Sequence, residues 1–263
     1  MAFPSSPRVV YDNNPLTQVI CQLKFPTILE IGSADPADFQ KRIRKQYPIY
    51  HGPSESSTIS SRIPQELSAL AARVGLSMGR PGPHRFAIEN ETRSISLSPE
   101  FVAITEDSYT RWDELRPEIA LMVEALVKVY EPPFFSRIGL RYQDEIDRKL
   151  LGLEDEPWKN LIKPELTGLV GVDFLEDRIL ESHSNTLCVV QDDKLSAKIR
   201  ISQGLVAGSE KNKYTIDADL FVDERTEVND VLPILDQLNR TGGNFFRWVI
   251  TDKLANALKP QSI

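Results

Sequence analysis

Residues 112–146, WDELRPEIALMVEALVKVYEPPFFSRIGLRYQDEI, place a long helix directly before a long strand and thereby decide the fold class. The helix is predicted from apolar residues at spacings of three and four, namely Trp112, Leu115, Ile119, Met122, Leu126 and Val129. Two consecutive prolines, Pro132 and Pro133, end it. The strand over residues 134–146 is predicted from an alternation that puts Ile138, Leu140 and Tyr142 on one face.

Further strands and helices flank this segment on both sides. Upstream, strands are expected over residues 16–25, 85–89, 93–97 and 101–105, with helices from Asp35-Pro36 and over 63–74. Downstream, strands are expected over residues 178–190, 195–203 and 213–223, followed by helices over 226–240 and 244–258 that Gly242-Gly243 separates. The sequence therefore predicts an α+β protein of antiparallel sheets with packed helices.

The order of these elements indicates two parts. Strand, helix, strands, helix and strand follow one another in residues 16–146, which predicts a ferredoxin-like N-terminal half. A loop-like, acidic stretch from residue 150 marks the expected boundary, so residues 1–149 form an α+β half and residues 150–263 a three-stranded sheet with helices. A single continuous domain is the alternative. One short internal repeat suggests two similar halves, because Thr110 and Thr226 each precede a proline by seven residues.

Composition narrows the class of protein. The chain has 263 residues and a net charge of −7, which does not favour nucleic acid as the main ligand. Two isolated cysteines, Cys21 and Cys188, indicate thiols in a reducing compartment. No apolar run is long enough to span a bilayer, and the N-terminal residues do not resemble a secretory signal. We expect a cytoplasmic protein without a membrane segment.

Signatures of catalysis are not found in the sequence. The three histidines, His51, His84 and His183, do not have metal-ligand spacing. The segment from Gly75 to Gly82 lacks the ending of a phosphate-binding loop, and no nucleophile elbow is present. We therefore expect no metal, no cofactor and no catalytic residues.

Two arginines on one strand face are the candidate ligand site. Arg137 and Arg141 alternate with apolar residues, and Lys24 is expected nearby. Arginines on one strand face can bind a phosphate or carboxylate through paired hydrogen bonds. The alternative is pairing with Asp144, Glu145 or a neighbouring helix.

Opposite charges also lie on two downstream strands. One antiparallel register places Arg200 opposite Asp217 and Lys198 opposite Asp219. We interpret these residues as cross-strand ion pairs on a solvated face, rather than as a cation site.

The C-terminal segment carries more apolar side chains than one helix face needs. Phe245, Phe246 and Trp248 lie close together in it. Core packing against the second sheet is one reading. A surface for a protein partner or for a second copy of the chain is the other.

Three stretches resemble a family of bacterial proteins. They are Asn14-Pro15-Leu16 with Val19 and Leu23-x-Phe25, then Arg137-Ile138-Gly139-Leu140-Arg141-Tyr142, and finally Leu235-Asp236-x-Leu238 with Phe246 and Ile250-Thr251-Asp252-Lys253. The chain resembles a sporadically distributed family of bacterial proteins of about this length, for which no function is assigned. The resemblance implies a cytoplasmic, stand-alone protein, and the patchy distribution points to mobile or defence-type gene neighbourhoods. Similar proteins often have a histidine where this chain has Asn239.

Three functional hypotheses follow. The first is a non-catalytic accessory subunit of a bacterial cytoplasmic system, which binds another protein or itself. The resemblance points to a defence-related system. The second is a binder of, or an enzyme acting on, a small anionic or nucleotide ligand held by Arg137 and Arg141. The third is an RNA-binding module, which would need a continuous basic stripe with exposed aromatic residues.

Overall fold

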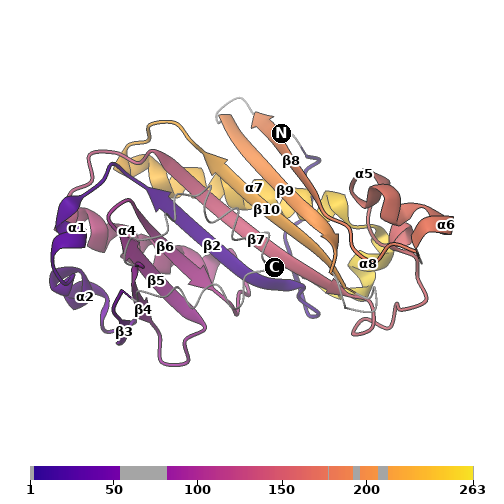
Figure 1. The fold of residues 1–263 in the computed structure, drawn as a ribbon, viewed down its shortest axis with the longest axis horizontal. Helices are drawn as coiled ribbons and strands as arrows, with labels where there is room; N and C mark the ends of the chain where they lie inside the picture. The colour runs from indigo at the N-terminus through magenta and orange to yellow at the C-terminus, as the bar shows by residue number, and fades with distance from the viewer. Residues whose placement is uncertain (1–2, 54–81, 177, 192–195, 207–212, 263) are drawn as a thin grey trace.

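A single large antiparallel sheet dominates the computed structural model, which describes residues 3–53, 82–176, 178–191, 196–206 and 213–262 (Figure 1). Its nine strands run in the order β3-β4-β5-β6-β2-β7-β10-β9-β8. Their bounds are β2 Leu16–Lys24, β3 Ile49–His51, β4 His84–Ala87, β5 Arg93–Ser98, β6 Phe101–Glu106, β7 Arg137–Asp147, β8 Ser184–Gln191, β9 Ser196–Leu205 and β10 Lys213–Val222. A separate two-stranded sheet pairs β1 Val9–Tyr11 with β11 Pro260–Ser262.

Two long helices, α4 Trp112–Tyr130 and α7 Val231–Val249, lie together on one face of the sheet (Figure 1). Shorter helices are α1 Leu29–Ser33, α2 Ala37–Ile43, α5 Pro164–Thr167, α6 Asp173–Glu176 and α8 Asp252–Ala257. The expected α+β class and its antiparallel sheet are thus confirmed. The helix expected over 63–74 lies outside the described residues.

The sheet buries one face, as its alternating sequence predicts. On β7, Ile138, Leu140, Tyr142 and Ile146 point towards the helices and are buried, whereas Arg137 and Arg141 lie on the opposite face. Because side chains alternate along a strand, every second residue of β2, β9 and β10 follows the same pattern. The core lies between this face and helices α4 and α7.

The two central strands, β2 and β7, pair antiparallel with each other, for example through Val19 opposite Tyr142. Beyond β2 lies the meander β6-β5-β4, and beyond β7 lies the meander β10-β9-β8. Helix α4 follows β6, and helix α7 follows β10. The expected boundary at residue 149 falls just after β7, which shares ten Cα pairs with β10, so the sheet continues across it.

The strand order of the N-terminal half agrees with the ferredoxin-like expectation. Strands β5, β6, β2 and β7 are neighbours in that order, which corresponds to strands 2, 3, 1 and 4 of the motif, and their ladders are antiparallel, as the motif requires. The neighbours of β2 are β6 and β7. Strands β4 and β3 extend this four-stranded arrangement beyond β5.

Gly242-Gly243 does not separate two helices, as the sequence suggested, because α7 continues through both glycines. A Cβ at residue 242 would lie 2.8 Å from Cε2 of Tyr142, so only glycine lets the helix approach the sheet this closely. A Cβ at residue 243 would meet no atom within 4 Å. Gly242 therefore allows α7 to contact the sheet closely, whereas Gly243 faces open space.

Candidate functional site

A cavity of about 460 Å³ lies between the sheet, helix α7, the start of α4 and the N-terminal residues. Its floor comes from the sheet, where Tyr142 and Asp144 of β7 and Ala218 of β10 line it. Its volume is in the range of small-molecule pockets, about 300–1,000 Å³. The cavity is the candidate functional site.

Residues 3–16, which we call the N-terminal strap, form one wall of the cavity. Phe3 packs edge-on against Phe245 with ring centroids 5.2 Å apart. The backbone N–H of Ser6 donates to Oδ1 of Asn244 at 3.1 Å. Nδ2 of Asn14 donates to the carbonyl oxygen of Tyr109 at 2.8 Å, and β1 pairs with β11. The strap is therefore held along its length by α7, the start of α4 and the C-terminus.

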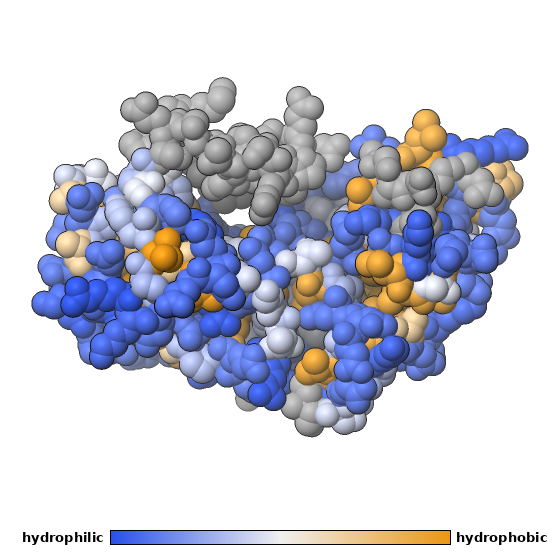
Figure 2. Space-filling view, turned by 90° about the horizontal axis from the view of Figure 1, so that it is seen from below, coloured by the Kyte–Doolittle hydropathy of each residue, from blue (hydrophilic) through white to orange (hydrophobic). Residues whose placement is uncertain are grey.

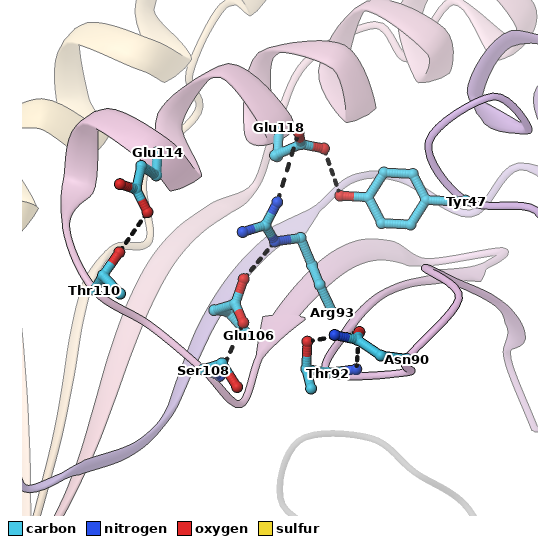
Figure 3. A network of polar contacts seen from close by, with 9 residues as sticks. All are labelled: Tyr47, Asn90, Thr92, Arg93, Glu106, Ser108, Thr110, Glu114 and Glu118. Atoms are coloured by element: carbon cyan, nitrogen blue, oxygen red, sulfur yellow. Dashed lines mark hydrogen bonds and ion pairs between the residues drawn. The ribbon is translucent and has the colours of Figure 1, made fainter.

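A polar network holds the start of helix α4 against the β5–β6 hairpin (Figure 3). Arg93 forms ion pairs with Glu106 and with Glu118, the latter with Nη1 to Oε1 at 3.6 Å. The Tyr47 hydroxyl donates to Oε2 of Glu118 at 2.8 Å, and burial raises the pKa of Tyr47 above its usual range. This network positions residues 109–113 and Arg116, which line the cavity.

Asp144 is the chemically unusual residue of the site. Its side chain is only 5% exposed and lies on the inward face of β7. Burial raises the pKa of its carboxyl well above the usual range, and nearby Asp217 raises it further. No hydrogen bond or ion pair to this carboxyl exists in the described part of the chain. Buried polar groups are nearly always hydrogen-bonded, so Asp144 calls for a partner in the cavity.

Tyr142 links the floor to helix α7. Its hydroxyl donates to Oδ1 of Asn239 at 2.9 Å. Tyr109 packs edge-on against the Tyr142 ring with centroids 6.2 Å apart. Burial raises the pKa of both tyrosines, and Arg8 opposes this effect at both hydroxyls. These contacts place two aromatic rings, one amide and one arginine charge around the carboxyl of Asp144.

Arginines collect around the same cavity. Arg116 donates from Nε and Nη2 to the two carboxylate oxygens of Asp236, at 2.8 and 2.9 Å. Arg247 pairs with Asp252. Arg8 and Arg240 also line the cavity, and neither forms an ion pair with the residues the structure describes. Their guanidinium groups remain available to an anion.

The arginines singled out in the sequence lie elsewhere, on the opposite face of the sheet. Nη2 of Arg137 donates to both carboxylate oxygens of Asp219, at 2.7 and 2.8 Å, and its guanidinium lies over the Phe221 ring. Nε of Arg141 donates to Oδ1 of Asp217 at 2.7 Å. The positive charge of both arginines is thus compensated within the protein.

Lys24 does lie beside Arg137, because the two residues are direct partners in the β2–β7 ladder. Burial and the neighbouring Arg137 lower the pKa of Lys24. The anion-binding role of these three residues stays a prediction, but the Arg–Asp pairs do not favour it.

The predicted register of the two downstream strands is wrong by two residues. Asp219, not Asp217, lies opposite Arg200, and Phe221 lies opposite Lys198. Nζ of Lys198 instead pairs with Asp223 at 2.7 Å. Asp217 and Asp219 instead form ion pairs with the two arginines of β7. Strand periodicity alone does not reveal these contacts.

The three aromatic residues singled out near the C-terminus have intramolecular partners. Phe245 is buried and contacts Phe3. Phe246 packs against Tyr11 with centroids 5.8 Å apart, and Lys163 lies 5.1 Å from the Trp248 ring. Their role in an interface stays a prediction, whereas their role in holding the N-terminal strap follows from these contacts.

Sequence reasoning missed Asp144 as a site residue, although a signal was present. On β7 the inward positions are Ile138, Leu140, Tyr142, Asp144 and Ile146, so a carboxyl falls in the apolar phase of the strand. A charged residue at such a position is rarely buried without a reason. The cavity residues Arg8, Tyr109 and Asn239 had no comparable signal.

No protein-family model and no curated protein matches the chain. The family resemblance noted from the sequence therefore stays a prediction. Among the described residues, no three His, Cys, Asp or Glu side chains group as metal ligands. Within the same ranges, no helix combines the length and apolar character that crossing a bilayer needs.

Proposed function

We propose that this protein binds a small molecule in the cavity beneath the N-terminal strap. The observation that carries the proposal is Asp144, a buried carboxyl that lines the cavity and lacks a partner in the described ranges. A carboxyl that lines a cavity and has no hydrogen bond to the protein is available to a molecule held in that cavity. A ligand with N–H donors would supply the missing hydrogen bonds.

The walls suit such a role because they are already in place. The polar network around Arg93 holds the start of α4. Contacts of Phe3, Ser6 and Asn14 hold the N-terminal strap. Gly243 leaves space in front of the cavity without weakening the packing, since no atom would touch its Cβ. A preformed pocket binds without a large ordering cost.

The proposal is tested by occluding the cavity at Gly243. Wild type, Gly243→Ala and Gly243→Leu are purified gently from the native host, and small molecules released on denaturation are identified by mass spectrometry. Because Gly243 lines the cavity, a methyl group there adds little volume, whereas a leucine side chain is large enough to narrow the cavity. A molecule held by wild type and Gly243→Ala but lost from Gly243→Leu is expected. Equal content in all three folded proteins would count against the cavity.

A second candidate function is protein interaction through the outer edge of β8, the last strand of the sheet order. Leu187 is 50% exposed and Val189 is 65% exposed on this strand. Its sequence, SNTLCVVQ, has no charged residue or proline that would discourage pairing with another strand. Exposed Leu169, Phe174 and Leu180 lie in the neighbouring segment.

Figure 2 shows one face of the molecule as mostly hydrophilic, with hydrophobic residues gathered mainly in the right-hand half. That is the end at which Figure 1 places α5, α6 and α8. An accessory subunit would use such a surface for a partner protein. Native mass spectrometry of wild type and of the double variant Leu187→Ser, Val189→Ser tests this role. A defined complex that the double variant loses is expected, and a monomer in both cases removes the candidate.

A further inference from the structure

The chemistry of the cavity changes from its floor to its rim. At the floor, the carboxyl of Asp144 lacks a hydrogen-bond partner among the residues described. The walls are aromatic, with Tyr109, Tyr142 and Phe246 among them. Around the rim, arginines outnumber the acidic residues that pair with them, and Arg8 and Arg240 stay unpaired in the described chain. A ligand that matches the floor, the walls and the rim has hydrogen-bonding atoms at one end, an aromatic ring and a negative charge at the other end.

The floor selects for a flat group with adjacent hydrogen-bonding atoms. An ionised carboxylate accepts two N–H bonds side by side, and a protonated one donates one bond and accepts another. The edge of a purine base offers both patterns, since guanine has two adjacent N–H groups and adenine has an amino group beside a ring nitrogen. Either base would satisfy the Asp144 carboxyl without a metal ion.

The walls suit the same group. Tyr109 and Tyr142 meet edge to face, so ring surface remains for a third aromatic system. Aromatic side chains bind bases through stacking, which contributes about 1–3 kcal/mol per base. Gly242 and Gly243 leave the α7 wall of the cavity without a side chain at these two positions.

The rim selects for an anion. Arg8 and Arg240 both line the cavity and are exposed at their outer ends. A phosphate carries about −1.5 to −2 charges near neutral pH and accepts paired hydrogen bonds from guanidinium groups. Arg116 and Arg247 are engaged by Asp236 and Asp252, which leaves Arg8 and Arg240 for this contact.

We propose that the cavity takes a purine nucleoside monophosphate, with the edge of the base on Asp144, the ring beside Tyr109 and Tyr142, and the phosphate at Arg8 and Arg240. This inference rests on the proposed ligand-binding function and names the ligand class. It places the anion at two arginines other than Arg137 and Arg141, which are bound to aspartates on the far face.

The test is calorimetric titration of the full-length protein with guanosine and adenosine 5′-monophosphates, the two parent nucleosides and inorganic phosphate. At least one monophosphate is expected to bind at least tenfold more tightly than its nucleoside and than phosphate alone. Arg8→Gln is expected to weaken binding of the monophosphate several-fold more than binding of its nucleoside, because it removes one of the two arginines at the phosphate. Arg44→Gln, on an exposed residue outside the cavity, is the matched charge control and is expected to bind as wild type does.

Asp144→Leu is expected to lower the affinity for the monophosphate at least tenfold, because leucine cannot hydrogen-bond to the base. Asp144→Asn separates the two bases, since an amide can still match adenine but not the two N–H groups of guanine. It also serves as the test if the leucine variant does not fold. The assignment of the base to Asp144 is overturned if Asp144→Asn binds guanosine monophosphate as tightly as wild type does. It is also overturned if Asp144→Leu binds either monophosphate as tightly as wild type does.

The outcomes separate this inference from the function on which it rests. If neither monophosphate binds, but a host molecule is lost from Gly243→Leu, the ligand class is overturned and the binding function stands. If neither monophosphate binds and no host molecule depends on residue 243, both are overturned. Binding that survives Gly243→Leu unchanged places the nucleotide outside the cavity and also overturns the inference.

Discussion

The hydroxyl of Tyr142 donates a hydrogen bond of 2.9 Å to Oδ1 of Asn239, which ties the floor of the cavity to the middle of helix α7. Tyr142 belongs to β7 and Asn239 lies 97 residues further along the chain. The contact links the central strand of the sheet to the helix that carries the glycine pair, and it defines one edge of the space above Asp144.

This bond gives the first prediction. Tyr142→Phe is expected to lower the free energy of unfolding by about 1 kcal/mol, because it removes one partly buried hydrogen bond and little packing. Urea unfolding measures the change. A cycle with Asn239→Ala and the double variant isolates the pair, since the double variant should lose less than the sum of the two single variants. Strict additivity would show that the bond contributes nothing.

The adjacent glycines of α7 are predicted to respond in opposite directions. Gly242→Ala places a Cβ 2.8 Å from the Tyr142 ring and is expected to destabilise the protein by about 1–2 kcal/mol through overpacking. Gly243→Ala meets no atom within 4 Å and is expected to stabilise it by about 0.5–1 kcal/mol, because alanine favours the helix. Thermal unfolding of the two variants provides the comparison. A stabilising Gly242→Ala would contradict the close contact between helix and sheet.

Asp144 predicts a particular dependence of stability on pH. Its folded-state pKa lies above the usual value of 3.8, so the unfolded chain releases the proton first as the pH rises. Asp144 therefore destabilises the fold progressively above about pH 4. Asp144→Asn is expected to be more stable than wild type at pH 7, and the two should converge below pH 4. Denaturant unfolding across this range measures the difference, and a constant gap at all pH values would contradict a buried, unpaired carboxyl.

The two cysteines are predicted to differ in reactivity. Cys188 is exposed on β8, whereas Cys21 is buried in β2 and burial raises its pKa to about 12. Because the thiolate is the reactive form, a thiol reagent should modify one cysteine in the native protein and both after unfolding. Mass spectrometry of Cys188→Ser, treated under native conditions, should show no modification. Rapid labelling of that variant would mean that β2 opens readily.

Much of the secondary structure and of its burial follows from local pattern. The spacing from Trp112 to Leu126 predicts α4, and the alternation of Ile138, Leu140 and Tyr142 predicts β7 together with its buried face. The same alternation marks Asp144 as a polar residue in an apolar phase. These properties depend on periods of 3.6 and 2 residues, which the linear order of side chains contains.

Other features depend on pairings that no local pattern encodes. The antiparallel contact of β7 with β10 joins the two parts of the chain in one sheet, and the Arg137–Asp219 and Arg141–Asp217 pairs shift the expected partners of the charged residues. Gly242 reads as a helix break until Tyr142 is placed against it.

The sequence by itself determined the α+β class, most strands of the large sheet, helix α4, the inward face of the sheet and the presence of a carboxyl on that face. Only the tertiary structure decided the pairing of β7 with β10, the partners of the arginines and the cavity. The physical reason is separation along the chain: Arg8, Tyr109, Asp144 and Asn239 surround one space only because the strap, α4, β7 and α7 pack together. Local propensity acts over a few residues, whereas this site is made by contacts between residues about a hundred or more positions apart.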